Sequence, residues 1–131
     1  MSEAAKMRVD VLVIDDDAVM RELMADWLEA AGYGVGKAAS CTTGLALAKN
    51  DLPGLVVTDM CMPGPSGAAA ITKLKEQHPE VRVIAISGYF NSGHGLSADA
   101  ALEAGAARAL AKPVKRAEFI RAVAELLGPP V

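Results

Sequence analysis

Five polar side chains in this sequence could together bind a phosphoryl group. They are Asp15, Asp16, Asp59, Ser87 and Lys112, and each follows an apolar run. Carboxylates held close together repel one another, by about 4 kcal/mol for a pair at ~4 Å and an effective dielectric of about 20. A Mg²⁺ ion removes this repulsion, because it binds through one or two carboxylates together with phosphate oxygens and water. The added lysine charge and hydroxyl donor favour a site where a phosphoryl group is bound to, or transferred onto, a carboxylate.

These residues follow predicted strands in a chain where strand and helix alternate five times. The predicted strands are Val9–Ile14, Tyr33–Ala39, Leu55–Val57, Val81–Ile86 and Ala107–Ala111. The predicted helices are Ala18–Ala31, Thr42–Lys49, Ser66–Gln77, Ser97–Gly105 and Arg116–Leu127. The alternation predicts an α/β fold with a parallel sheet. Right-handed crossovers predict the doubly wound, flavodoxin-like strand order 2-1-3-4-5, with the first and third strands side by side.

The third predicted strand is the one around which the site is organised. Leu55–Val57 is rich in β-branched residues and lacks polar alternation, so we expect burial on both faces. Pro63 and Gly64 cannot continue the strand, which places Asp59 at its carboxyl end. In open parallel sheets this edge binds ligands, so the acidic pair and Asp59 are expected to share one pocket.

Length and composition limit the class of protein. At 131 residues the chain predicts one domain over residues 1–131, with residues 1–7 as a flexible N-terminus and 128–131 as a tail. The net charge of −3 and the lack of a Lys/Arg cluster argue against nucleic-acid binding. No apolar run is long enough for a membrane span, and Cys41 and Cys61 suit reduced thiols. We therefore expect a cytoplasmic protein without membrane contact.

Four motifs, in order along nearly the whole chain, resemble the receiver domain of two-component response regulators. They are Val13-Ile14-Asp15-Asp16-Asp17, Asp59-Met60-Cys61-Met62-Pro63-Gly64 with Gly67, Ser87-Gly88, and Lys112-Pro113. Each motif alone is weak evidence, whereas four in register are strong. The resemblance implies a signalling module that is not an enzyme, apart from its own autophosphorylation and autodephosphorylation.

The resemblance also implies a role for each matching residue. Asp59 would be the phosphoacceptor, supplied by a sensor histidine kinase or a histidine phosphotransfer protein. Asp15 and Asp16 would bind Mg²⁺, with Asp59 and the backbone carbonyl of Cys61 completing the protein ligands. Ser87 would be the switch hydroxyl. Lys112 would pair with the acyl phosphate, and the bond to the following proline is expected to be cis.

The predicted output surface departs from the family pattern. Phosphorylation would re-pack the face formed by helix four, strand five and helix five, where a downstream protein would bind. Ala109 stands where the family usually has an aromatic, so rotamer switching of that aromatic is unavailable. Val114 replaces a second common aromatic, and the loop Tyr89–Leu96 is longer than usual.

Two other functions stay open at the level of sequence. Asp15-x-Asp17-x-Val19 also resembles the nucleophile motif of haloacid-dehalogenase phosphohydrolases, in which Asp15 would be modified and Asp59 would be idle. A pseudo-receiver that binds partners without phosphorylation is the third possibility. The chain could also be a receiver cut from a longer regulator, with Gly128-Pro129-Pro130 starting a linker.

Two local alternatives are less favoured. Asp17 stands where a helix N-cap belongs, so we expect it to cap the first helix and not to bind metal. Met60, Cys61 and Met62 could suggest a soft-metal site, but alternating residues cannot all point at one ion.

Overall fold

The computed structural model describes residues 9–50, 52–59, 67–87 and 98–128. Within them strand and helix alternate as predicted. The elements are β1 Val11–Ile14, α1 Ala18–Ala30, β2 Val35–Ala38, α2 Cys41–Asn50, β3 Leu55–Asp59, α3 Gly67–Gln77, β4 Arg82–Ser87, α4 Ala98–Ala104, β5 Arg108–Ala111 and α5 Arg116–Leu127. The expectations for residues 1–7, most of the tail, Ser66, Cys61 and the loop Tyr89–Leu96 lie outside the described residues.

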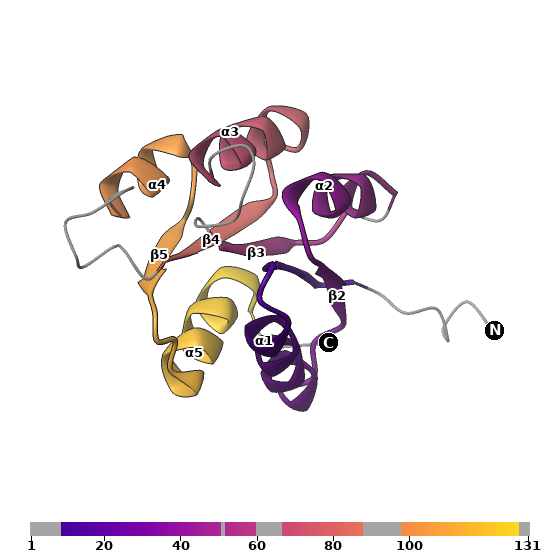
Figure 1. Ribbon diagram of the computed structural model, residues 1–131, viewed down its shortest axis with the longest axis vertical. Helices are drawn as coiled ribbons and strands as arrows, with labels where there is room; N and C mark the ends of the chain where they lie inside the picture. The colour runs from indigo at the N-terminus through magenta and orange to yellow at the C-terminus, as the bar shows by residue number, and fades with distance from the viewer. Residues whose placement is uncertain (1–8, 51, 60–66, 88–97, 129–131) are drawn as a thin grey trace.

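The strands form one parallel sheet in the order β2-β1-β3-β4-β5, which confirms the predicted fold class and topology. Helices α1 and α5 cover one face, and α2, α3 and α4 cover the other (Figure 1). The register pairs Ile14 with Thr58 and Asp59 with Ile86. The polar residues that follow β1 and end β3 are therefore brought to the same edge.

Strand alternation divides the core into two apolar clusters, one on each face of the sheet. Val11 and Val13 pack toward α1 and α5, while Leu12 and Ile14 pack toward the other three helices. Every residue of β3 is buried, which confirms the expected central position of this strand. Phe119 on α5 is completely buried.

The sequence predicted the limits of the helices more accurately than it predicted which helix residues are buried. Helix α5 has the predicted limits, and Asp17 caps α1 because its Oδ1 accepts hydrogen bonds from the backbone N–H groups of Val19 and Met20. The helical spacing of the apolar residues in Ala18–Ala31 predicts that Leu23 faces inward, but Leu23 is 39% exposed because it lies at the edge of the buried stripe of α1. The spacing in Ser66–Gln77 likewise predicts that Ala69 faces inward, and Ala69 is exposed.

Hydrogen bonds join the last turn of α5 to the amino-terminal edge of the sheet. Tyr33, expected within the second strand, instead lies before β2 and donates a 2.9 Å hydrogen bond to the carbonyl of Gly128. Arg82, the first residue of β4, donates to the carbonyl of Leu126. These two side chains satisfy carbonyls that a helix end otherwise leaves without partners.

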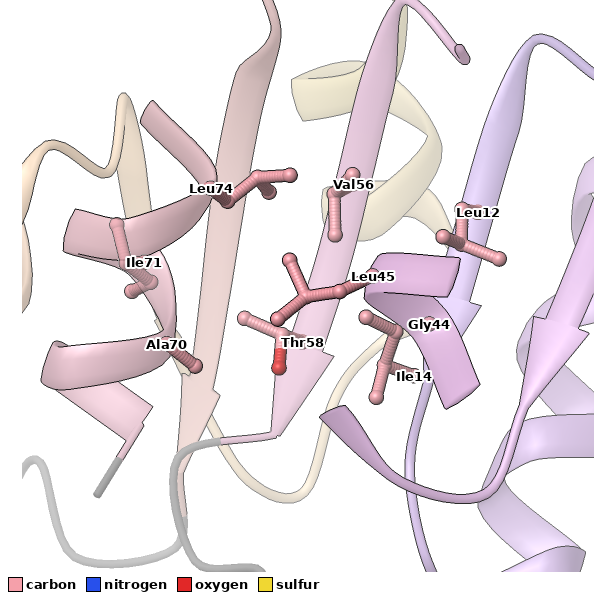
Figure 2. A pocket seen from close by; sticks show the side chains of 9 residues that line it. All are labelled: Leu12, Ile14, Gly44, Leu45, Val56, Thr58, Ala70, Ile71 and Leu74. Carbon is pink, nitrogen blue, oxygen red and sulfur yellow. The ribbon is translucent and has the colours of Figure 1, made fainter. Parts of the chain in front are cut away.

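A small apolar pocket lies over β1 and β3, between α2 and α3 (Figure 2). It is lined by Leu12, Ile14, Gly44, Leu45, Val56, Thr58, Ala70, Ile71 and Leu74. Of these side chains only that of Thr58 is polar. Because neighbouring strand residues point to opposite faces, Thr58 lines this pocket while Asp59 belongs to the other side of the sheet.

Candidate functional site

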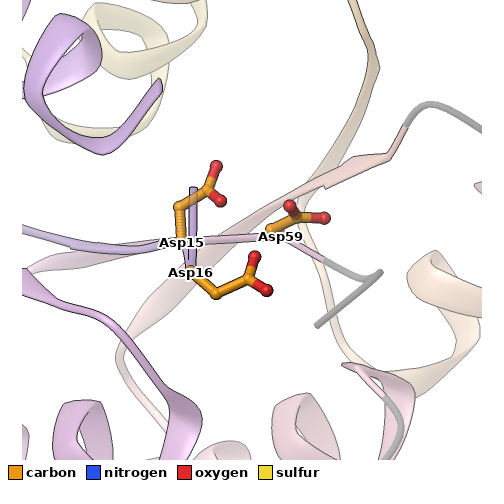
Figure 3. A group of neighbouring side chains, drawn as sticks. All are labelled: Asp15, Asp16 and Asp59. Atoms are coloured by element: carbon orange, nitrogen blue, oxygen red, sulfur yellow. The ribbon is translucent and has the colours of Figure 1, made fainter. Parts of the chain in front are cut away.

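Three carboxylates gather at the carboxyl ends of β1 and β3 (Figure 3). One oxygen from each of Asp15, Asp16 and Asp59 lies within 4.8 Å of the others. Asp15 and Asp59 are 0% and 4% exposed, whereas Asp16 is exposed. The structure therefore brings the three predicted carboxylates together, with one of them open to solvent.

Asp15 is held in place by its neighbours on three sides. Its backbone N–H donates to the carbonyl of Ala38 on β2 at 3.1 Å, and its Oδ1 accepts from the N–H of Asp17 at 2.9 Å. Its carbonyl accepts a 2.9 Å hydrogen bond from Nη1 of Arg21 on α1. Among the described residues, its buried Oδ2 accepts no hydrogen bond.

Lys112 reaches the same cluster from the end of β5. Its Nζ donates to Oδ2 of Asp59 at 2.8 Å and lies 3.8 Å from Oδ2 of Asp15. The Lys112–Pro113 bond is cis, as the resemblance implied. The backbone N–H of Lys112 donates to the carbonyl of Ser87 at 3.0 Å, so these two residues are neighbours at the ends of β4 and β5. Ser87 itself is buried.

Burial makes one carboxyl group unusually basic. The pKa of Asp15 is raised from 3.8 to about 6, chiefly because burial disfavours its charged form and further because of the nearby Asp59. The Asp17 N–H and the Lys112 charge act in the opposite direction without cancelling the rise. The environment of Asp15, chiefly its burial, therefore disfavours the charged form of this carboxyl group.

The donor set fits a hard divalent cation. The oxygens are carboxylate oxygens, the ligand type that Mg²⁺ prefers, and within the part of the chain that the structure describes the buried Oδ2 of Asp15 accepts no hydrogen bond. A buried acceptor left without a partner is costly, and a cation would satisfy it. Asp15, Asp16 and Asp59 are therefore the residues that could hold Mg²⁺. The proposed carbonyl ligand on Cys61 lies outside the described residues.

Comparison with known proteins identifies the family. A family model described as the response regulator receiver domain matches residues 11–124. The chain belongs to the receiver domain family of response regulators. The regulator DctD of Rhizobium meliloti (strain 1021), a C4-dicarboxylate transport transcriptional regulatory protein, is 37% identical over 103 residues, covering 79% of this chain. The match covers only 22% of DctD, so this chain spans about a fifth of that relative.

Solved structures of receivers share the fold. The receiver domain of NtrX from Brucella abortus is 32% identical with a TM-score of 0.83, and the match covers 90% of this chain and 98% of that one. A response regulator from Burkholderia pseudomallei, solved with a phosphorylated aspartic acid, a calcium ion and citrate, is 30% identical with a TM-score of 0.77. That match covers 88% of this chain and 66% of the other.

Sequence reasoning did not find Arg21, whose contact with Asp15 only the structure reveals. An arginine in the first turns of a helix gives no signal by itself, because most such side chains are solvated.

The structure also describes the two residues that replace aromatic side chains common in the family. Ala109 pairs with Ala85 of β4, and Val114 is buried in the core between the sheet and α5. Within the described residues no helix has the length and apolarity that crossing a bilayer requires.

Proposed function

We propose that this receiver domain accepts a phosphoryl group from a phosphohistidine onto Asp59 and thereby changes its binding to a downstream protein. The single observation that carries the proposal is the contact between Lys112 Nζ and Asp59 Oδ2, 2.8 Å, beside two further carboxylates. The related Burkholderia protein, which contains a phosphorylated aspartic acid and a calcium ion, supports the same chemistry here.

Each side chain would have a defined part in the transfer. A carboxylate oxygen of Asp59 forms a bond to phosphorus as the phosphorus–nitrogen bond of the donor breaks, and the electron pair leaves with the imidazole nitrogen. Lys112 provides a positive charge for the incoming phosphoryl oxygens. Bound at Asp15, Asp16 and Asp59, Mg²⁺ would supply further charge to stabilise those oxygens.

The response would follow from the new charge on Asp59. A phosphoryl group adds acceptor oxygens that draw Lys112 and Ser87 toward it. Lys112 directly follows β5 and Ser87 ends β4, and a backbone hydrogen bond joins the two residues. Their movement would alter the face formed by α4, β5 and α5, where we place the downstream protein. Because Ala109 is small, the change cannot depend on an aromatic side chain at that position.

Labelling with a small-molecule phosphodonor tests the assignment. Incubation with acetyl phosphate and Mg²⁺ is expected to add one phosphoryl group, and trapping with borohydride followed by peptide mass spectrometry is expected to locate it on Asp59. An Asp59→Asn variant is expected to take up none, and EDTA is expected to prevent labelling of the wild type. Equal labelling of the Asn variant would refute the proposal.

The same experiment addresses the phosphohydrolase alternative. That reading requires Asp15 as nucleophile, yet Asp15 is fully buried and its Oδ1 is occupied by the N–H of Asp17. The family assignment also favours the receiver. Recovery of the label on Asp15 would support the hydrolase. A pseudo-receiver would take up no label at all in the presence of Mg²⁺.

The exposed start of α1 is a surface that a protein donor would have to approach. Val19 is 74% exposed and lies directly after the acidic turn, with its N–H on Asp17 Oδ1. Val19 and the exposed Leu23 line the same surface hollow on α1, and a contiguous exposed apolar patch favours partner contact. We predict that Val19→Lys slows transfer from a phosphohistidine donor roughly tenfold, as expected for loss of one important interface residue.

Two comparisons make this prediction specific to the donor protein. Labelling of Val19→Lys by acetyl phosphate is expected to equal that of the wild type, because the acidic cluster is unchanged. Leu47→Lys, at an apolar position on α2 across the sheet that is 41% exposed, is expected to leave both rates unchanged. A Val19→Lys variant that slows with both donors would indicate damage to the site itself.

A further inference from the structure

We propose that Arg21 is a positioning residue that sets the Mg²⁺ affinity of the acidic cluster by holding the carbonyl of Asp15. This inference rests on the metal site of the proposed function and adds a residue on α1 to it. The contact is the 2.9 Å hydrogen bond from Arg21 Nη1 to the Asp15 carbonyl, six residues earlier in the chain.

The position of that carbonyl explains why it needs a side-chain partner. β1 ends at Ile14, whose register partners are Ala38 on β2 and Thr58 on β3, so Asp15 lies just past the end of the strand. Arg21 reaches back across the turn between β1 and α1 with a side chain that is only 19% exposed. Its own backbone N–H donates to the carbonyl of Asp17, which fixes the start of the helix against the same turn.

Holding this one carbonyl orients two candidate metal ligands. The carbonyl belongs to the peptide unit that joins Asp15 to Asp16, and the unit is planar. Rotation of that plane would therefore redirect both carboxylates relative to Asp59. With Arg21 in place, the N–H, the carbonyl and Oδ1 of Asp15 all have partners, whereas Oδ2 accepts no hydrogen bond from the described residues and can face a cation.

Charge and position predict opposite effects when Arg21 is replaced. If its positive charge alone mattered, its removal would strengthen Mg²⁺ binding, because a nearby cation repels the metal. If orientation matters, its removal weakens binding, and residues that orient metal ligands typically change affinity by about 10–100-fold. The sign of the change therefore separates the two explanations.

Mg²⁺ titration of the unphosphorylated protein by calorimetry tests the inference without any phosphodonor. Arg21→Gln is expected to raise the dissociation constant for Mg²⁺ about tenfold. Arg21→Lys, which retains the charge and can donate one hydrogen bond, is expected to recover part of that loss. Arg121→Gln, at an exposed position on α5, changes the net charge equally and is expected to bind Mg²⁺ as the wild type does.

The outcomes separate failure of this inference from failure of the proposed function. If Arg21→Gln binds Mg²⁺ as tightly as the wild type, or more tightly, the positioning role is refuted even when Asp59 is labelled normally. If the wild type binds no Mg²⁺, the metal site and the inference are both overturned. Circular dichroism verifies folding. Should Arg21→Gln fail to fold, Arg21→Met, which also removes both the charge and the donor, takes its place, and Mg²⁺ binding by it as tight as in the wild type would refute the positioning role.

Discussion

In metal-free buffer at neutral pH, an Asp15→Asn variant is expected to be more stable than the wild type by about 3 kcal/mol. The carboxyl group of Asp15 is fully buried, and its pKa is raised from 3.8 to about 6. The folded protein therefore bears a cost for keeping this group charged. An amide removes the charge, and its oxygen can still accept the hydrogen bond from the N–H of Asp17.

The pH dependence of this difference follows from the direction of the shift. Because the folded protein binds the Asp15 proton more tightly than the unfolded chain, the wild type loses stability from this group as pH rises from 3.8 to about 6. Urea unfolding of both proteins in EDTA is expected to show the largest difference above about pH 7 and almost none below about pH 3. A variant less stable than the wild type at neutral pH would contradict the burial of a charged Asp15.

Magnesium is expected to reduce the difference in stability between the wild type and the Asp15→Asn variant. Binding to the folded wild type stabilises it by mass action, whereas the variant has lost one carboxylate of the cluster. Protons compete with the metal for Asp15, so wild-type affinity for Mg²⁺ is expected to fall below about pH 6. Wild-type and variant melting temperatures that respond equally to Mg²⁺ would exclude Asp15 as a ligand.

Replacing Lys112 is expected to have the opposite effect on apoprotein stability. In Lys112→Met the buried Asp59 carboxylate loses its 2.8 Å partner, and Asp15 loses a cation at 3.8 Å. Removing the cation of a buried ion pair takes away the countercharge of the remaining carboxylate, which costs about 3 kcal/mol, at the lower end of the usual range because 26% of the lysine side chain is exposed. Urea unfolding in EDTA measures this loss.

The same substitution is expected to strengthen metal binding. Without the lysine charge the cluster attracts Mg²⁺ more strongly, by roughly tenfold in affinity, and saturating Mg²⁺ is expected to recover most of the lost stability. Lys115→Met is the matched control, since Lys115 is exposed at the start of α5 and makes no side-chain capping bond. A control as unstable as Lys112→Met would show that the effect does not come from the acidic cluster.

The architecture was accessible from the sequence because its signals are local and repeated. Apolar β-branched runs predicted β1, β3 and β4, and the handedness of crossovers then left one strand order, which the structure has. The start of β2 and the buried face of α3 were predicted less accurately, because their local sequence signals are weak. Tyr33 falls before β2 because its ring packs into the core, a tertiary contact that strand propensity does not contain. Ala69 is exposed, since a small side chain contributes little to which face a helix buries.

The sequence predicted which residues form the acidic cluster, but not how deeply each of them is buried or which side chain contacts the Asp15 carbonyl. Asp15 and Asp16 follow β1, and Asp59 ends the neighbouring parallel strand β3, so all three lie at the same edge of the sheet. The difference in burial between Asp15 and Asp16 depends on which way each side chain leaves the turn, and neighbouring identical residues give no indication of that. The contact from Arg21 likewise depends on how far α1 rotates relative to β1.

The anchoring of α5 has a practical consequence for surface-based assays. Its last carbonyls are held by Tyr33 and Arg82, which precede or begin strands at the edge opposite the acidic cluster. A biotin attached to the last turn of α5 would therefore tether the protein by the side opposite the acidic cluster, so that immobilisation on a sensor chip leaves Asp59 facing the flowing analyte.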